Sequence, residues 1–386
     1  MKIINRDNLN IFRDEAIEIL RTLIAFDTTS RNSNLELIDW VQDYLEKYGA
    51  YCRRIFNHDK TKANLIARFG GNNSGGIVLS GHSDVVPIDD QDWHTDPWVL
   101  TQIGDKLYGR GTADMKAFSA CFLALVPQIA KLSLKEPIYY ALSYDEEIGC
   151  LGAPSMVEFL AQENSEIRAV IVGEPTNMKI VSGHKSISTF NVEITGLEAH
   201  SSRIDMGVSA IMEAIPLMAF LSDLGQKYRP QDSIYEPSGT TITIGLIEGG
   251  TATNILAHHC RFSFDIRNEP NFPLDDLIQE IENEIAKLDA KIKLRAPNGG
   301  AKMSIRSRTL GLKFAPNSAA EQLVRQITGD NEICGVAYAA EAGIFQNNNM
   351  PAVICGPGSI LQAHQPDEFI EIIEIEKCLS FLSELI

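Results

Sequence analysis

The sequence predicts an α/β protein in which a mostly parallel sheet is interrupted by a smaller inserted domain. Short apolar runs alternate with helical patterns in the first half of the chain and again near its end. That order is typical of buried parallel strands that are joined by helices. From about 183 to 296 apolar and polar residues alternate instead, as they do in strands with one solvated face.

The strands predicted for the larger domain are short and rich in apolar residues. They cover residues 76–80, 137–143, 168–173 and 351–359. Residues 114–132 and 152–163 have the apolar periodicity of helices, and residues 1–20 have helical spacing without the apolar core of a signal peptide. We therefore expect 1–182 and 297–386 to form one α/β domain.

The segment between these two parts has its own order of elements. Strands are predicted at 186–196, 240–250, 258–267 and 291–296, with helices at 207–224 and 274–290. This β-α-β-β-α-β order is that of a small split βαβ sandwich. The expected inserted domain is 183–296, and the alternative is one continuous sheet.

Composition excludes several classes of partner. The 386 residues carry 34 basic and 51 acidic side chains, a net charge of −17, which argues against nucleic acid or an anionic membrane as a partner. No apolar stretch reaches membrane-spanning length, since the best candidate, 117–130, is short and contains Pro127. Seven cysteines without a CxxC pair indicate reduced thiols, and we expect a cytoplasmic protein.

Histidines and carboxylates recur just beyond the ends of the predicted strands or in the loops that follow them. They are His82, Asp114, the pair Glu146 and Glu147, Glu174 and His364. The carboxyl ends of strands in an open α/β sheet line one crevice, so residues distant in sequence converge there. Two histidines and three carboxylates suit zinc, or more loosely cobalt or manganese. If one carboxylate bridges, five ligands hold two ions.

Each of these residues also has an ordinary structural explanation. A lone histidine near a strand end is usually a hydrogen-bonded structural residue, and Asp114 has the position of a helix N-cap. Glu174 precedes Pro175 and suits a turn, while the glutamate pair suits a solvated helix start. Adjacent side chains on an extended segment diverge, however, so one glutamate can face a metal and the other a substrate.

Five motifs, taken together, resemble the co-catalytic metallopeptidase family. They are GHSDVVP (81–87), GRGTADMKAF (109–118), DEE (145–147), GEPTN (173–177) and AHQPDE (363–368), and the resemblance runs in order from about residue 20 to 380. It implies a zinc-exopeptidase-like fold with a lid and dimerisation domain, two Zn²⁺ ions, and hydrolysis of a small-molecule N-acyl amino acid. A catalytically inactive binding protein is the non-enzyme alternative, and no GxSxG motif supports a serine hydrolase.

The resemblance implies a role for each residue of the constellation. Asp114 bridges the two ions, His82 and Glu174 complete one site, and Glu147 and His364 complete the other. The remaining roles are carried by two carboxylates: Glu146 is the general base, and Asp84 orients the His82 ring through its second nitrogen. The peptide bond after Asp114 is expected to be cis.

Further residues are implied to contact the substrate. His200 donates to the developing oxyanion, in dimeric members from the partner subunit, and Asn254 and Arg267 hold the substrate carboxylate and the oxyanion. Glu341 matches an acidic position that can receive a substrate ammonium. A locally bonded turn histidine and a hairpin salt bridge are the alternatives for His200 and Arg267. A homodimer is expected.

Overall fold

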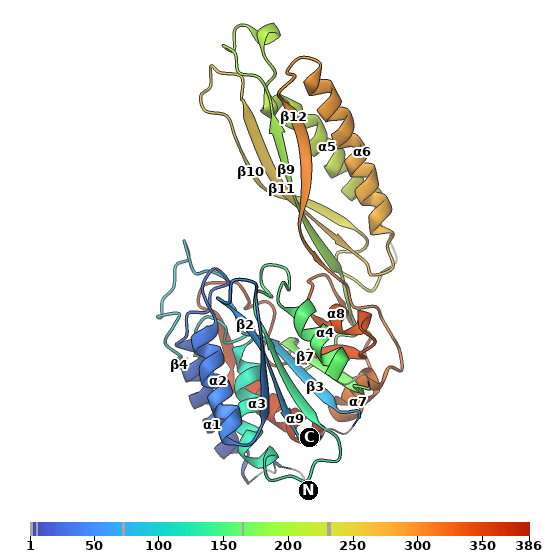
Figure 1. The fold of residues 1–386 in the computed structure, drawn as a ribbon. Helices are drawn as coiled ribbons and strands as arrows, with labels where there is room; N and C mark the ends of the chain where they lie inside the picture. The colour runs from blue at the N-terminus through green and yellow to red at the C-terminus, as the bar shows by residue number, and fades with distance from the viewer. Residues whose placement is uncertain (1–2, 5–6, 72–73, 164–165, 230–232) are drawn as a thin grey trace. The chain divides into compact units, whose positions relative to one another are not determined.

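The chain divides into two compact units (Figure 1). The computed structural model describes residues 3–4, 7–71, 74–163, 166–229 and 233–386. The first unit comprises Met1–Gly183, Leu312–Gly335 and Ala340–Ile386, and the second comprises His184–Gly311 and Val336–Ala339. The second unit therefore begins one residue after the predicted start of the insertion and continues past 296. Each unit is described by itself.

A six-stranded sheet forms the centre of the first unit. Its order is β1 (Tyr51–Phe56), β2 (Ala63–Phe69), β6 (Ile138–Ser143), β3 (Ile77–His82), β7 (Ala169–Pro175) and β14 (Ala352–Gly356). The last four strands are parallel, whereas β1 and β2 are antiparallel to their neighbours. The four predicted strands are thus the parallel part of the sheet, whose continuous apolar runs are buried on both faces.

Helices cover both faces of this sheet. One group is α1 (Leu9–Ile24), α2 (Leu35–Lys47), α3 (Lys116–Ile129), α7 (Ala319–Thr328) and α9 (Ile372–Leu385), whose apolar residues join one core cluster with alternate residues of the strands. The helices α4 (Ala153–Glu163) and α8 (Ala342–Asn347) contact each other, and Figure 1 shows them on the other side from α1 and α2. No helix in the described part of the chain is long and apolar enough to cross a membrane.

Two small sheets lie outside the larger sheets in the described part of the chain. The antiparallel strands β4 (Thr101–Ile103), β5 (Lys106–Tyr108) and β15 (Phe369–Glu371) form one of them. The strands β8 (Gly183–His184) and β13 (Gly335–Val336) form the other.

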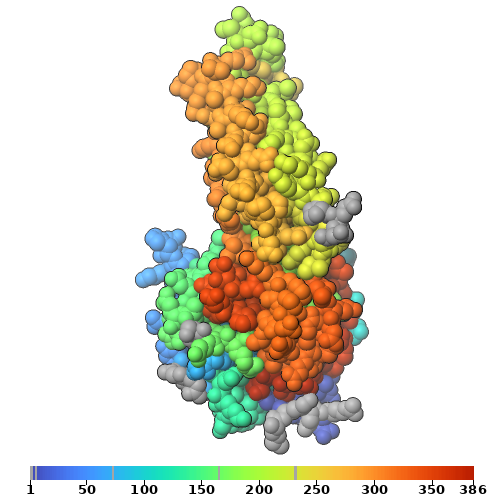
Figure 2. All heavy atoms as spheres, turned by 90° about the vertical axis from the view of Figure 1, so that its right-hand side faces the viewer, coloured from blue at the N-terminus to red at the C-terminus, as the bar shows by residue number. Residues whose placement is uncertain are grey.

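The second unit is an antiparallel sheet with two helices on one face. The sheet order is β10 (Thr241–Gly249), β11 (His259–Asn268), β9 (Ser186–Thr195) and β12 (Gly300–Thr309). Figure 2 shows α6 (Leu274–Lys293, orange) beside α5 (Ala210–Lys227, yellow-green) on the surface of this unit, which also contains the short 3₁₀ helix η1 (Ile204–Met206). Every second residue of β9 and β11 packs beneath the helices, as the alternating pattern predicted.

One predicted element of the second unit is wrong. Residues 291–296 do not form a strand, because α6 continues to Lys293 and the closing strand is β12. Ile285, Leu288 and Ile292 keep the helical spacing and pack into the core of this unit, so the apolar pattern favours a longer helix. The order β-α-β-β-α-β is nevertheless observed.

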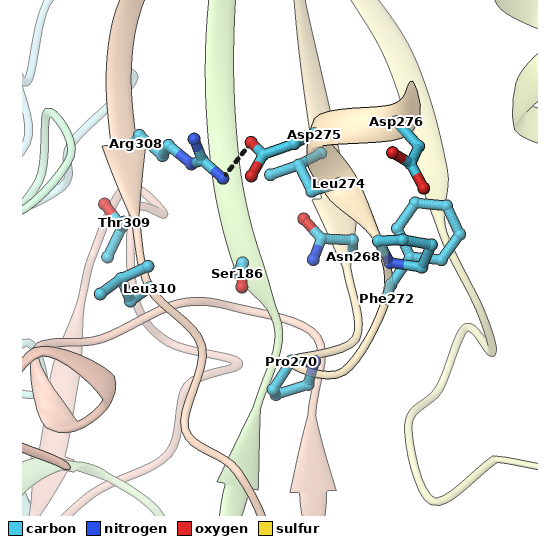
Figure 3. A pocket seen from close by; sticks show the side chains of 11 residues that line it. Ser186, Asn268, Pro270, Phe272, Leu274, Asp275, Asp276, Arg308, Thr309 and Leu310 are labelled. Carbon is cyan, nitrogen blue, oxygen red and sulfur yellow. Dashed lines mark hydrogen bonds and ion pairs between the residues drawn. The ribbon is translucent and has the colours of Figure 1, made fainter. Parts of the chain in front are cut away.

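The second unit also contains a groove of about 310 Å³ (Figure 3). It lies where β9 and β12 meet the start of α6, and Arg308 reaches across it to the Asp275 carboxylate at 2.8 Å. Asn268 is 2% exposed at its wall. No predicted site residue lines this groove.

Candidate metal centre

The parallel strands bring the predicted ligands to one edge of the sheet. His82 is the last residue of β3, Glu174 lies near the end of β7, and Glu146 and Glu147 follow β6. These three strands are neighbours in the order β6-β3-β7 and run the same way. Their carboxyl ends therefore meet, which is the usual place for a site in an open α/β sheet.

Asp114 lies at the centre of the cluster and faces two histidines. Its Oδ1 is 3.0 Å from Nε2 of His82, and its Oδ2 is 3.5 Å from Nε2 of His364. Its carboxylate does not cap the following helix, because α3 begins at Lys116 and has Met115, without a side-chain bond, at its N-cap. The Asp114–Met115 peptide bond is cis, as the resemblance implied.

Each histidine is accompanied by one glutamate. His82 Nε2 lies 3.8 Å from Glu174 Oε1, and His364 Nε2 lies 2.9 Å from Glu147 Oε2. The structure thus brings all five predicted ligands together, as two pairs that share one aspartate. Potential ligand atoms of His82, Asp114 and Glu147 lie within 4.8 Å of one another.

Burial makes this concentration of carboxylates electrostatically unfavourable without a cation. Burial raises the pKa of Glu174 well above its usual value, and the charge of Asp114 adds to this effect. Burial and the same charge raise the pKa of Glu147 to about 7. Hydrogen bonds to Asp114 and Glu147 raise the pKa of His364 to about 10. Without a metal ion, these buried groups therefore bind protons, which reduce the negative charge of the cluster. A divalent cation would balance the same charge.

The residues present fit a divalent cation. The Glu147 side chain is 5% exposed, and its Oε1 is buried without a hydrogen-bond partner among the described residues. A buried carboxylate oxygen without a partner is costly unless a cation or water satisfies it. Imidazole and carboxylate are ligands that zinc takes in proteins.

Glu146 lies beside the ligand pairs. One of its carboxylate oxygens is within 4.8 Å of ligand atoms of His82 and Glu174, so its position suits either a base or a ligand. The Cys150 thiol donates to its Oε1 at 3.2 Å. Burial, together with the charge of Glu147, raises the pKa of Glu146 well above its usual value.

Asp84 contacts the site differently from the prediction. The His82 ring meets the main-chain carbonyl of Asp84, at 2.8 Å from Nδ1, whereas the carboxylate is 3.7 Å away. The carboxylate accepts hydrogen bonds from the main-chain N–H groups of Glu146 at 3.0 Å and Glu147 at 3.3 Å, and from Ser30 Oγ at 2.7 Å. Asp84 therefore fixes both the ring and the turn that carries the glutamate pair.

Glu341 is more enclosed than its predicted role requires. It is 1% exposed, and its two oxygens accept hydrogen bonds from Ser80, at 3.2 Å, and from Ser143. Burial raises its pKa to about 7. This arrangement favours support of the strands beneath the site over contact with a substrate ammonium.

Three predicted residues belong to the second unit. The segments of His200 and Asn254 lie side by side, since Ser201 N donates to Asn254 O at 2.9 Å, and both side chains are exposed. His200 Nδ1 is 2.8 Å from Ser202 Oγ. Arg267 lies at the opposite end of β11 from this pair, where it donates to Ala337 O at 3.3 Å.

Two contacts at the site were not predicted from the sequence. Cys150 bonds to Glu146 from four residues further along the chain. Glu368 ends the motif AHQPDE and accepts main-chain hydrogen bonds from the loop before Asp114. Glu368 is part of the motif AHQPDE, but the spacing of that motif does not indicate which groups form hydrogen bonds with Glu368.

Sequence comparison relates the chain to proteins of known class. Residues 78–386 match peptidase family M20/M25/M40. An acetylornithine deacetylase from Pasteurella multocida is 34% identical over 376 residues, which cover 95% of this chain and 94% of that protein. Another from Aliivibrio fischeri is 32% identical over 393 residues, with 97% of each chain covered.

Solved structures agree on the fold. A metallo-carboxypeptidase from Sulfolobus solfataricus matches with a TM-score of 0.79 at 17% identity, covering 96% of this chain and 98% of its own. A tripeptidase from Staphylococcus aureus matches with a TM-score of 0.76 at 20% identity, covering 97% of each chain. With the histidine and carboxylate cluster, these relatives identify a metal-dependent hydrolase, and the chain belongs to peptidase family M20/M25/M40.

Proposed function

We propose that the protein is a dinuclear zinc amidohydrolase that removes the acetyl group from N2-acetyl-L-ornithine. The products are L-ornithine and acetate, a step of arginine biosynthesis in the cytoplasm. Support for the substrate comes from relatives named acetylornithine deacetylase that are 32–34% identical over nearly the full length. The alternative is a succinyl-diaminopimelate desuccinylase or another N-acyl-amino-acid deacylase. A desuccinylase would need a pocket for the second carboxylate, which lies on the acyl group.

The observation that carries the dinuclear proposal is the orientation of Asp114. Its two oxygens face different histidines, and each histidine has its own glutamate. A carboxylate placed in this way would be shared by two ions, one of which would be held by His82 and Glu174 and the other by Glu147 and His364. Cobalt or manganese can replace zinc at ligands of this type.

Glu146 is the proposed proton carrier. Zinc ions held by the five candidate ligands would polarise the substrate carbonyl and lower the pKa of a water molecule, which would supply the nucleophile. Glu146 accepts the proton of the attacking water and then donates it to the departing amine, which would otherwise be a poor leaving group. Its raised pKa suits a group that must hold a proton in transit. The Asp84 carboxylate holds the backbone of Glu146 and Glu147 in place, because it accepts hydrogen bonds from their main-chain N–H groups.

We propose further that the enzyme acts as a homodimer. His200 and Asn254 lie near one end of β11, whereas Arg267 lies near the other. A ten-residue strand is roughly 30 Å long, so one substrate is too small to contact both ends. Arg267 from one subunit and His200 with Asn254 from its partner satisfy this geometry in a two-fold symmetric pair.

The first experiment compares substrates. Zinc-loaded protein should release ornithine from N2-acetyl-L-ornithine and should be inactive after treatment with a chelator. N-succinyl-L,L-diaminopimelate, assayed in parallel for released amine, should react poorly. Release from the succinyl compound alone would replace the proposed substrate while keeping the reaction class.

Metal should stabilise the first unit. All three tryptophans, Trp40, Trp93 and Trp98, lie in that unit, so their fluorescence reports its unfolding. Zinc at a hundred times its dissociation constant should stabilise the metal-free protein by about 2.7 kcal/mol. Asp114→Asn should lose most of this gain, whereas the exposed Asp105→Asn should keep it. An equal gain in both variants would contradict the bridging assignment.

Glu146→Gln should separate a base from a ligand. If Glu146 is the base, the Glu146→Gln variant should still bind two zinc ions, as measured by native mass spectrometry, while its turnover falls by about 10²- to 10⁴-fold. Glu158→Gln, an exposed change on α4, is the control and should keep full activity. Loss of one ion from Glu146→Gln would make this residue a ligand.

Mixed dimers should test whether His200 acts across the interface. His200→Ala and Glu146→Gln should each be nearly inactive alone. When the two chains are coexpressed, about a quarter of wild-type activity should return, because half of randomly paired dimers are mixed and each mixed dimer has one intact site. No recovery in verified mixed dimers would assign His200 to its own subunit's site.

A further inference from the structure

A buried carboxylate holds the loop that carries Asp114. Glu368 is 1% exposed, and each of its oxygens accepts two hydrogen bonds. Its Oε1 accepts from the main-chain N–H groups of Ala113 at 2.8 Å and Asp114 at 3.0 Å. Its Oε2 accepts from Gly111 N at 3.0 Å and from Arg110 Nη1 at 2.7 Å. One side chain therefore fixes the conformation of the loop before the central aspartate.

The same carboxylate belongs to the segment that carries His364. The strands β5 and β15 pair so that Tyr108 lies opposite Phe369. The loop to Asp114 begins directly after Tyr108, and the loop from His364 ends directly before Phe369. Two segments that supply predicted ligands are thus anchored on one short antiparallel ribbon.

Arg110 extends this connection toward the histidine. It is 1% exposed, donates to the main-chain oxygen of Gln365 at 3.3 Å, and donates to Gln91 Oε1 at 2.6 Å. Gln91 in turn donates through Nε2 to the main-chain oxygen of His364 at 3.0 Å. The Arg110 guanidinium also lies 5.0 Å from the centre of the Trp93 ring. The consecutive main-chain oxygens of His364 and Gln365 are therefore both tied to the buried ion pair, the first through Gln91.

Global stability is a weak explanation for this pair. Burying two charges costs desolvation energy that their attraction often only offsets, so apolar residues serve the core as well. A carboxylate that accepts three main-chain N–H groups has another consequence, since it fixes backbone positions that apolar side chains cannot fix. Here those positions belong to the loop that carries the Asp114 carboxylate, 3.5 Å from the His364 ring.

We propose that Glu368, with Arg110, is a positioning residue that sets the separation of Asp114 and His364 and so controls occupancy of the ion site that these two ligands share. This inference rests on the proposed dinuclear centre. Neither residue contacts an ion or the substrate in this scheme. Partners that orient metal ligands typically change metal affinity by about 10- to 100-fold when they are removed.

The test uses the near-isosteric variant Glu368→Gln and a matched control. Glutamine replaces one acceptor oxygen by a donor that faces other donors. Glu321→Gln is the control, because Glu321 is also a buried carboxylate of the first unit, paired with Arg325 at 2.7 Å but in contact with no predicted ligand. A decrease in stability that is common to both variants is thereby separated from an effect on the site.

The first readout needs no metal. Hydrogen exchange of the metal-free protein should show loss of protection at the amides of Gly111, Ala113 and Asp114 in Glu368→Gln and not in Glu321→Gln. The second readout is cobalt(II) titration followed by visible absorption. The weaker of the two binding steps should be about 10- to 100-fold weaker in Glu368→Gln, with an altered ligand-field spectrum, and unchanged in the control.

A milder variant covers the case in which Glu368→Gln does not fold. Gln91→Ala removes the hydrogen bonds to Arg110, His364 and Trp93 without leaving a charge unpaired, and it should weaken the same step by about two- to tenfold. Wild-type protection and cobalt affinity in both variants would overturn the proposal, as would a wild-type protein that binds no second ion. Failure to hydrolyse any N-acyl amino acid, with these metal and exchange effects intact, would overturn only the proposed substrate.

Discussion

The site depends on one geometric constraint, which is that β6, β3, β7 and β14 run parallel and end at one edge of the sheet. Parallel strands need long connections, so the residues that meet at this edge are separated by tens to hundreds of positions along the chain. His82 and Glu174 lie on the strands β3 and β7, and the glutamate pair lies in the turn after β6 that Asp84 holds. Asp114 and His364 come from loops, and their positions require additional support.

The arrangement has an electrostatic cost in the absence of a cation. Glu146, Glu147 and Glu174 all have raised pKa values, with burial as the largest cause in each case. A divalent cation converts mutual repulsion of carboxylates into attraction to a common centre. A cation is therefore the charge that this buried cluster lacks, and hydrogen bonds accepted by the carboxylates of Asp84 and Glu368 hold the surrounding backbone in place.

Sequence patterns predicted the parts of the structure that side-chain periodicity encodes. The four parallel strands and the β-α-β-β-α-β order follow from apolar runs and alternation. The candidate ligands were predicted because they stand at strand ends or in the loops that follow, and the family resemblance supplied their roles. The predicted strand at 291–296 was wrong because Ile285, Leu288 and Ile292 continue a helical stripe. The contacts of Asp84 and Glu368 were missed because they involve main-chain N–H and C=O groups, which every residue has and no pattern displays.

Asn254 and Arg267 lie near opposite ends of β11 in the second unit, and their separation bears on assembly. Asn254 precedes β11, Arg267 is near its end, and the pairing of β11 with β9 keeps the strand extended between them. A side chain adds only several ångströms at each end, so these residues do not reach one small substrate from a single copy of the unit. If both contact substrate, two chains contribute to each site. On the proposed substrate contacts, the length of β11 makes subunit association a condition of catalysis.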